Sequence, residues 1–184
     1  MNKRSKRARL RGVTPSANAY HRVGSRSPVL FLDFDGVMHP MPYFPDELFC
    51  RCHLVEQVIL SFPELRVVIS SDWRKSRSLI QLHEVFRCEV MPQVIDVTPR
   101  WDAYRDLYGL TTYSRQWECE KWLVQNGLAP SGPAATPWVA VDDMREWFEP
   151  DCPNLLWTNP KTGFTDQDVA DLRARLTQMT LKED

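Results

Sequence analysis

The stretch VLFLDFDGVMHP, residues 29–40, decides the fold of this chain. Its apolar run is typical of a strand that is buried on both faces of a parallel sheet. The run leads into two aspartates, Asp33 and Asp35, and then into Gly36, which lets the backbone turn sharply. Two carboxylates this close repel each other and resist ionising in an apolar setting, so we expect a positive charge beside them.

The rest of the chain alternates strand-like and helix-like segments. Apolar runs predict further strands at LRVVISS (65–71), WVAVDD (138–143) and NLLWTN (154–159), and VIDVTP (94–99) favours a short one inside a loop-rich stretch, 89–113. Helical patterns follow at 46–61, at 74–88, at 114–127 with Gly127 at the end, and after Thr165, where Asp168 completes a capping box. This alternation predicts an α/β fold with a doubly wound, mostly parallel sheet.

Composition is that of a soluble globular protein. Of the 184 residues, 43% are hydrophobic and 26% charged, and no apolar run reaches the length of a membrane span. The five cysteines are scattered and odd in number, which indicates free thiols in a reducing compartment, so we expect a cytoplasmic protein. Cys50, Cys52 and His53 suggest zinc, but a structural zinc site needs a second ligand cluster, and the sequence offers none.

Charge is distributed unevenly along the chain. Residues 1–27, here called the basic arm, hold eight of the 23 bases and no acid, which leaves 15 bases against 24 acids in the rest. The arm has no helical or strand periodicity, so we expect it to be disordered and residues 28–184 to form the catalytic domain. It also lacks the apolar segment of a secretory signal. The sequence leaves three roles open for the arm: it could bind nucleic acid, act as a solubilising tail or serve as an organellar transit peptide.

Polar side chains end three of the predicted strands: Asp33 and Asp35, Ser70 and Ser71, and Asp142 and Asp143. The carboxyl ends of parallel strands meet at one edge of a sheet, where α/β proteins bind their ligands. A carboxylate cluster without a ring of His or Cys suits a hard cation, and Mg²⁺ is the expected one. With the Ser70 hydroxyl and a cationic side chain to hold phosphate oxygens, the cluster suits phosphoryl transfer through an aspartyl-phosphate.

Three segments in this order carry a family resemblance. DFDGV (33–37), VVISS (67–71) and VAVDD (139–143) resemble motifs one, two and four of the haloacid dehalogenase-like (HAD) phosphohydrolases, over roughly residues 28–178. The resemblance implies a Rossmann-like core, Mg²⁺ dependence and hydrolysis of phosphomonoesters.

The resemblance also implies a role for each motif residue. Asp33 would be the nucleophile and a metal ligand. Asp35 would act as general acid and then as general base, with its backbone carbonyl as a further metal ligand. Ser70 would bind the transferring phosphoryl group, and Asp142, with Asp143, would complete the metal site.

The third motif of the family, a Lys or Arg near the start of the helix before the DD strand, has two candidates here. Arg115 opens the predicted helix, and Lys121 lies nearly two turns further on. Because a helix start near the strand ends can face the site, geometry favours Arg115 over Lys121.

Little space is left for a cap over the site. About one helix separates the first two motifs, so we expect a minimal cap and an open site that admits a large substrate, such as a nucleic-acid end. SSDWRKS (70–76) and the spacing R-x-x-E-x-x-x-WL (115–123) are similar to small HAD domains associated with RNA-repair proteins. Ser71, Trp73, Arg74 and Lys121 are candidate substrate contacts; Trp73 and Arg74 suit a base or a backbone phosphate, and Trp73 suits packing equally well.

Two other functional classes compete with the phosphatase. A receiver-like phosphoacceptor domain also uses acidic clusters, but it places a lone aspartate in mid-chain, whereas this chain has DxD first and DD last. A non-catalytic HAD-fold module that binds nucleic acid would not need Asp33 and Asp35 intact. Oligomeric state and the physiological substrate are not indicated by the sequence.

Overall fold

The computed structural model describes residues 27–103 and 112–181. The predicted basic arm therefore lies outside the described residues, apart from Ser27. Among the described helices, none is both long and apolar enough to cross a membrane.

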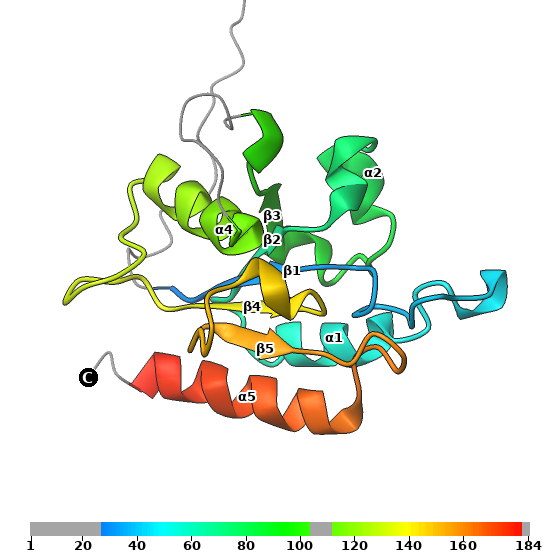
Figure 1. The fold of residues 1–184 in the computed structure, drawn as a ribbon. Coiled ribbons are helices and arrows are strands. Elements are labelled where there is room, and N and C mark those ends of the chain that lie inside the picture. Colours follow the sequence, from blue (N-terminus) through cyan, green and yellow to red (C-terminus); the bar gives the residue numbers. More distant parts are fainter. Residues whose placement is uncertain (1–26, 104–111, 182–184) are drawn as a thin grey trace, which may run out of the picture.

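The centre of the protein is a five-stranded sheet in the order β3-β2-β1-β4-β5, with every pair parallel (Figure 1). Its members are β1 (Val29–Leu32), β2 (Arg66–Ile69), β3 (Val94–Val97), β4 (Trp138–Asp142) and β5 (Leu155–Trp157). The predicted α/β fold with a parallel Rossmann-like sheet is confirmed, including the short strands within 94–99 and 154–159. The three central strands, β1, β2 and β4, form from almost completely buried apolar runs, whereas the edge strands β3 and β5 are only partly buried.

The register of the central strands brings their carboxyl ends level. Leu32 at the end of β1 pairs with Ile69 of β2 on one side and with Val141 of β4 on the other. The ladder continues one step beyond β1, because the Ser70 amide donates to the Leu32 carbonyl at 2.9 Å and the Asp33 amide to the Val141 carbonyl at 3.1 Å. The side chains that follow the three strands therefore start at the same height above the sheet.

Helices cover both faces of the sheet, as a doubly wound fold requires. Leu30 and Leu32 of β1 share one buried cluster with residues of α1 (Cys52–Ile59) and α5 (Asp166–Leu181). Val29 and Phe31 point the opposite way, into a second cluster with α4 (Ser114–Gln125). Figure 1 shows α4 on one side of the sheet and α1 with α5 on the other.

The prediction of one helix over 46–61 is wrong in its first half. A single 3-10 turn, η1 (Pro45–Glu47), comes first, and α1 begins only at Cys52. Between them Phe49 has a left-handed backbone (φ 57°), and its ring packs edge-on against Phe34, His39 and Trp73. This aromatic packing overrides the local helical pattern. The described stretch between the DFDGV motif and α1, residues 38–51, contains η1 as its one helical element, so it holds no cap domain, in agreement with the predicted minimal cap.

The prediction of a helix over 74–88 is wrong at both ends, because the α-helix there spans only 79–83. Residues 72–75 form a 3-10 turn, η2 (Asp72–Lys75), and α2 (Leu79–His83) begins after Ser78, which forms a capping box with Gln81. The predicted helices over 114–127 and after Thr165 are confirmed. Gly127 follows α4 with φ 72°, and the Asp168 carboxylate accepts from the Thr165 amide at 2.8 Å and from its hydroxyl at 2.6 Å. The remaining 3-10 turns are η3 (Met91–Gln93), η4 (Trp101–Ala103) and η5 (Arg145–Trp147).

All five cysteines lie in the described ranges, and all are free thiols, as predicted.

Candidate active site

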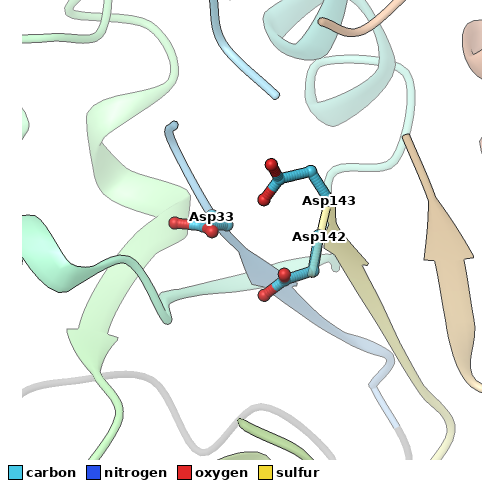
Figure 2. Close-up of side chains that lie close together, drawn as sticks. All are labelled: Asp33, Asp142 and Asp143. Atoms are coloured by element: carbon cyan, nitrogen blue, oxygen red, sulfur yellow. The ribbon is translucent and has the colours of Figure 1, made fainter. Parts of the chain in front are cut away.

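The acidic cluster lies where the strand order reverses, between β1 and β4. In open parallel sheets this switch point leaves a crevice at the carboxyl ends of the strands. Asp33 follows β1, Asp142 ends β4, and Asp143 comes directly after it. Figure 2 shows the three side chains lying close together, and one oxygen from each carboxylate lies within 4.8 Å of the others. The structure thus brings together three of the four predicted metal-binding residues through their side chains.

Burial sets the electrostatics of this cluster. Asp33 is 4% exposed and Asp142 is fully buried. Burial raises the pKa of Asp33, against the opposing charge of Arg115. Burial and then the Asp33 charge raise the pKa of Asp142, and the same two causes raise that of Asp143 to about 6. The cluster therefore ionises fully only if a cation compensates it.

The residues fit a divalent cation such as Mg²⁺. Oδ2 of Asp142 is buried and has no hydrogen-bond partner among the described residues. Arg115 lies 3.3 Å from this oxygen through its Nε, but one guanidinium cannot balance three clustered carboxylates. Three converging carboxylates offer the hard oxygen ligands that Mg²⁺ prefers, and among the described residues this is the one group of acids, histidines and cysteines with such spacing.

Gly36 is required by the geometry of the cluster. Its φ of 67° is unfavourable for residues with a side chain, and a Cβ built there would lie 2.3 Å from Oδ2 of Asp143. The hydroxyl of Thr158, which is buried beyond the end of β5, donates to the Gly36 carbonyl at 3.0 Å. The turn after β1 is therefore fixed against Asp143 and tolerates no side chain.

Arg115 is the cation that reaches the acids. Its Nε lies 3.3 Å from Oδ2 of Asp142, and its Nη2 lies 4.0 Å from Oδ2 of Asp33. The side chain is 3% exposed, and Glu118 contacts its Nη1 at 3.5 Å. Burial alone would lower the pKa of Arg115, but the surrounding carboxylates raise it above its usual range, so the guanidinium stays charged. Lys121 lies further along α4, with its Nζ 5.9 Å from the centre of the Trp117 ring.

The two serines after β2 are buried beside the cluster. Ser70 is 1% exposed, and its Oγ has no hydrogen-bond partner among the described residues. A buried hydroxyl without a partner is unusual and is available for a ligand. The Ser71 hydroxyl accepts from the Trp73 amide at 3.4 Å and caps η2, and its hydrogen bond with Asp33 opposes the rise in the pKa of that carboxyl.

Asp35 has a different environment from the other aspartates. Its carboxylate accepts hydrogen bonds from Nε2 of His39 at 3.1 Å and from Nε1 of Trp73, which lies 3.1 Å from both oxygens. These bonds, that from His39 above all, lower the pKa of Asp35. Its carboxylate is not part of the three-residue cluster, so a role in metal binding would fall to its backbone carbonyl. His39 was not among the site residues predicted from the sequence, although it lies within the opening stretch.

Arg74 lies inside the protein, not at its surface. The Nη1 of Arg74 donates to the carbonyls of Ser70 and Ser71, its Nε donates to the Thr98 carbonyl at 3.2 Å, and its Nη2 forms an ion pair with Glu118 at 2.5 Å. Burial lowers its pKa. The guanidinium holds the turn that carries both serines, and a substrate phosphate would not reach it there. Glu118, which contacts both Arg74 and Arg115, is a second residue that was not predicted from the sequence.

A comparison with protein families gives a match to the family described as "HAD domain in Swiss Army Knife RNA repair proteins". The match covers residues 29–169, which include every residue of the candidate site described above. No curated protein and no solved structure matches the chain significantly.

Proposed function

The chain belongs to the family of HAD domains in Swiss Army Knife RNA repair proteins, and on that premise we propose that it is a Mg²⁺-dependent phosphomonoester hydrolase. The observation that carries the proposal is the buried convergence of Asp33, Asp142 and Asp143 within 4.8 Å, with Arg115 beside them. Bound there, Mg²⁺ would offset the negative charge of both the carboxylates and the substrate phosphate.

Asp33 is the proposed nucleophile. One of its carboxylate oxygens forms a bond to phosphorus while the bond from phosphorus to the leaving oxygen breaks, which gives an aspartyl-phosphate. The carboxylate of Asp35 ionises readily, so it takes up a proton when the negatively charged phosphate binds beside it, and it then gives this proton to the leaving oxygen. In the second half of the reaction Asp35 takes a proton from water, the water oxygen attacks phosphorus, and phosphate leaves with Asp33 regenerated.

Ser70 and Arg115 are the proposed phosphate ligands. The buried Ser70 hydroxyl, without a partner among the described residues, would donate to an oxygen of the transferring group. Arg115 keeps its charge and lies between Asp33 and Asp142, so it can stabilise charge that develops on the same group. We assign the cationic role of the third family motif to Arg115 and not to Lys121.

Nucleic-acid ends are the proposed substrate class. The name of the family refers to RNA repair, and the segment over 38–51, with one 3-10 turn, is too short for a cap domain, so a large substrate could reach the site. The basic arm adds eight positive charges to a chain whose remainder is acidic, so it would attract a polyanion.

Phosphate release from a substrate panel tests the proposal. The panel contains 3′- and 5′-phosphorylated RNA and DNA oligonucleotides, nucleotides, sugar phosphates and nitrophenyl phosphate, each assayed with Mg²⁺ and with EDTA. We expect Mg²⁺-dependent release that is fastest from oligonucleotide ends. No release from any compound, by a folded protein that still binds oligonucleotides, would instead favour the non-catalytic nucleic-acid-binding module.

A further inference from the structure

His39 and Trp73 both contact Asp35, but they do so unequally at its two oxygens. Oδ1 accepts from Nε2 of His39 at 3.1 Å and from Nε1 of Trp73 at 3.1 Å. Oδ2 has only a share of the Trp73 bond, also at 3.1 Å. The Asp35 side chain is 35% exposed, whereas that of His39 is fully buried. One oxygen of the carboxyl is therefore anchored from inside the protein, and the other is comparatively free.

The contacts of His39 set which ring nitrogen faces Asp35. Nε2 lies 3.1 Å from Oδ1 of Asp35, so it carries the hydrogen of this bond when the carboxyl oxygen accepts. Nδ1 is buried and has no hydrogen-bond partner among the described residues. His39 is thus a buried donor to Asp35.

Aromatic packing holds both donors in place. The His39 ring packs edge-on against Tyr43 and Phe49, with centroid distances of 4.4 and 5.3 Å. The Trp73 ring packs against Phe34 and Phe49 at 5.9 and 5.0 Å, and the Arg77 guanidinium lies 4.1 Å from its centroid. These contacts explain why Phe49 takes up a left-handed backbone: the turn before α1 delivers its ring to both donors.

We propose that His39 and Trp73 are positioning residues for the general acid of the reaction. They anchor Oδ1 of Asp35 and leave Oδ2, which has only a share of the Trp73 bond, to carry the proton to the leaving oxygen. The same two bonds stabilise the ionised carboxylate, which is the form that acts as the base in the second half of the reaction. The inference rests on the proposed function and adds two residues and an atom assignment to it. Neither residue touches the reacting atoms in this account; both act through Asp35. A carboxyl that is free to rotate would spend less time with its proton directed at the leaving group, and catalysis is sensitive to such misplacement.

The test uses single-turnover release of the leaving group, because this isolates the step in which Asp35 acts as an acid. The variants are His39→Leu, which removes the donor, His39→Gln, which keeps a side-chain N–H, and Trp73→Phe, which keeps the ring but removes its N–H. Substrates are an oligonucleotide end, whose hydroxyl must be protonated as it leaves, and nitrophenyl phosphate, whose nitrophenolate leaves without a proton. We expect His39→Leu and Trp73→Phe to slow the first substrate by roughly 10- to 100-fold, within the range of general acid–base contributions. Release of nitrophenolate should change less than about 3-fold, and His39→Gln should recover most of the loss.

A double-mutant comparison separates positioning from a merely structural role. In an Asp35→Asn background, His39→Leu should cause little further loss, because the residue through which it acts is already disabled. His83→Leu is the control, because it also removes a histidine hydrogen bond, but one that lies away from Asp35, between Nε2 of His83 and the Val94 carbonyl at 2.7 Å. Equal losses on both substrates, or full additivity with Asp35→Asn, would overturn the inference while leaving the phosphatase proposal intact. An inactive wild-type protein would instead overturn the proposed function.

Discussion

The guanidinium of Arg115 lies 4.0 Å from the carboxylate of Asp33, and both side chains are almost completely buried. Arg115 comes from the first turn of α4 and Asp33 from the end of β1, so the contact joins two separate elements. A buried carboxylate stays ionised only with a positive charge nearby. Arg115 therefore supplies one of the charges that the DFDGV sequence demands.

Replacing Arg115 should damage both stability and turnover. Arg115→Ala leaves Asp142 and Asp33 without their ion-pair partner, and removal of one member of a buried pair costs about 3–5 kcal/mol of unfolding free energy. Arg115→Lys keeps the positive charge but not the planar fork. It should therefore be more stable than Arg115→Ala, but its kcat should still be lower than that of the wild type. Lys121→Ala is the matched control, with an unfolding free energy within about 0.5 kcal/mol of wild type. Denaturant titrations measure the unfolding free energies of the variants, and steady-state assays measure their kcat. A loss of turnover in Lys121→Ala, with Arg115→Lys unaffected, would reverse the assignment.

Gly36→Ala should disrupt the metal site more than the fold. The substitution forces a side chain into a positive-φ position, at a cost of about 1–2 kcal/mol, and its Cβ would collide with Oδ2 of Asp143. Gly127→Ala is the control, because Gly127 has a similar φ of 72° but no atom within 4 Å of the added Cβ. Calorimetric titration with Mg²⁺ should show weaker binding for Gly36→Ala only. Equal Mg²⁺ affinity of the two variants would mean that Asp143 does not bind the metal.

The pH dependence of stability should reveal the acidic cluster. Burial raises the pKa of Asp143 to about 6 from an ordinary value of 3.8, so the folded protein holds this proton more tightly than the unfolded chain. The resulting stability is fully present below about pH 4 and is lost as the pH rises through about 6, because only the unfolded chain ionises freely. Bound Mg²⁺ favours the ionised cluster and should offset that loss.

Thermal unfolding between pH 4 and 8, with and without Mg²⁺, measures this effect. The increase in Tm caused by Mg²⁺ should grow across the window from pH 4 to 6 and then level off. In the Asp143→Asn variant, the Tm increase caused by Mg²⁺ should grow less between pH 4 and 6. A Tm increase that is the same at every pH would contradict a cluster whose protons Mg²⁺ displaces.

The sheet and the acids could be predicted from the sequence because they depend on local patterns. Buried runs such as VLFL and VVIS suit a strand wherever they lie, and the aspartates after them follow the carboxyl ends of parallel strands automatically. The starts of two helices were predicted wrongly because distant contacts decide them: Phe49 packs on aromatic rings, and Arg74 binds the Thr98 carbonyl and Glu118. Sequence alone does not show that an arginine points inward.

The partners of Asp35 were missed for a related reason. His39 follows Asp35 by four residues across an irregular turn, a spacing that has no fixed geometry outside a helix. Trp73 comes from a different segment of the chain, and its indole suited packing as well as hydrogen bonding. Glu118 is the acid of the R-x-x-E spacing at 115–123, but its role depends on the convergence of Arg74 and Arg115, which the sequence does not show.

Deleting the basic arm should affect oligonucleotides and spare small substrates. Removal of residues 1–26 takes away all eight bases and keeps Ser27, whose carbonyl accepts from the Arg66 guanidinium. The Michaelis constant for a phosphorylated oligonucleotide should rise, and the log–log salt slope of binding should shrink by about 0.7 for each single-strand phosphate that the arm no longer neutralises. Nitrophenyl phosphate kinetics should not change. Identical oligonucleotide kinetics and salt slopes with and without residues 1–26 would assign the arm another role.

Covalent phosphate on Asp33 is the most direct test of the central claim. In Asp35→Asn, nitrophenyl phosphate should still phosphorylate the enzyme, because its leaving group needs no proton, while hydrolysis of the intermediate stalls without the general base. Acid quenching and peptide mass spectrometry should then find phosphate on Asp33, in the presence of Mg²⁺ and not of EDTA. The same experiment with Asp33→Asn should find none. Phosphate release at the wild-type rate from a folded Asp33→Asn protein would contradict the account.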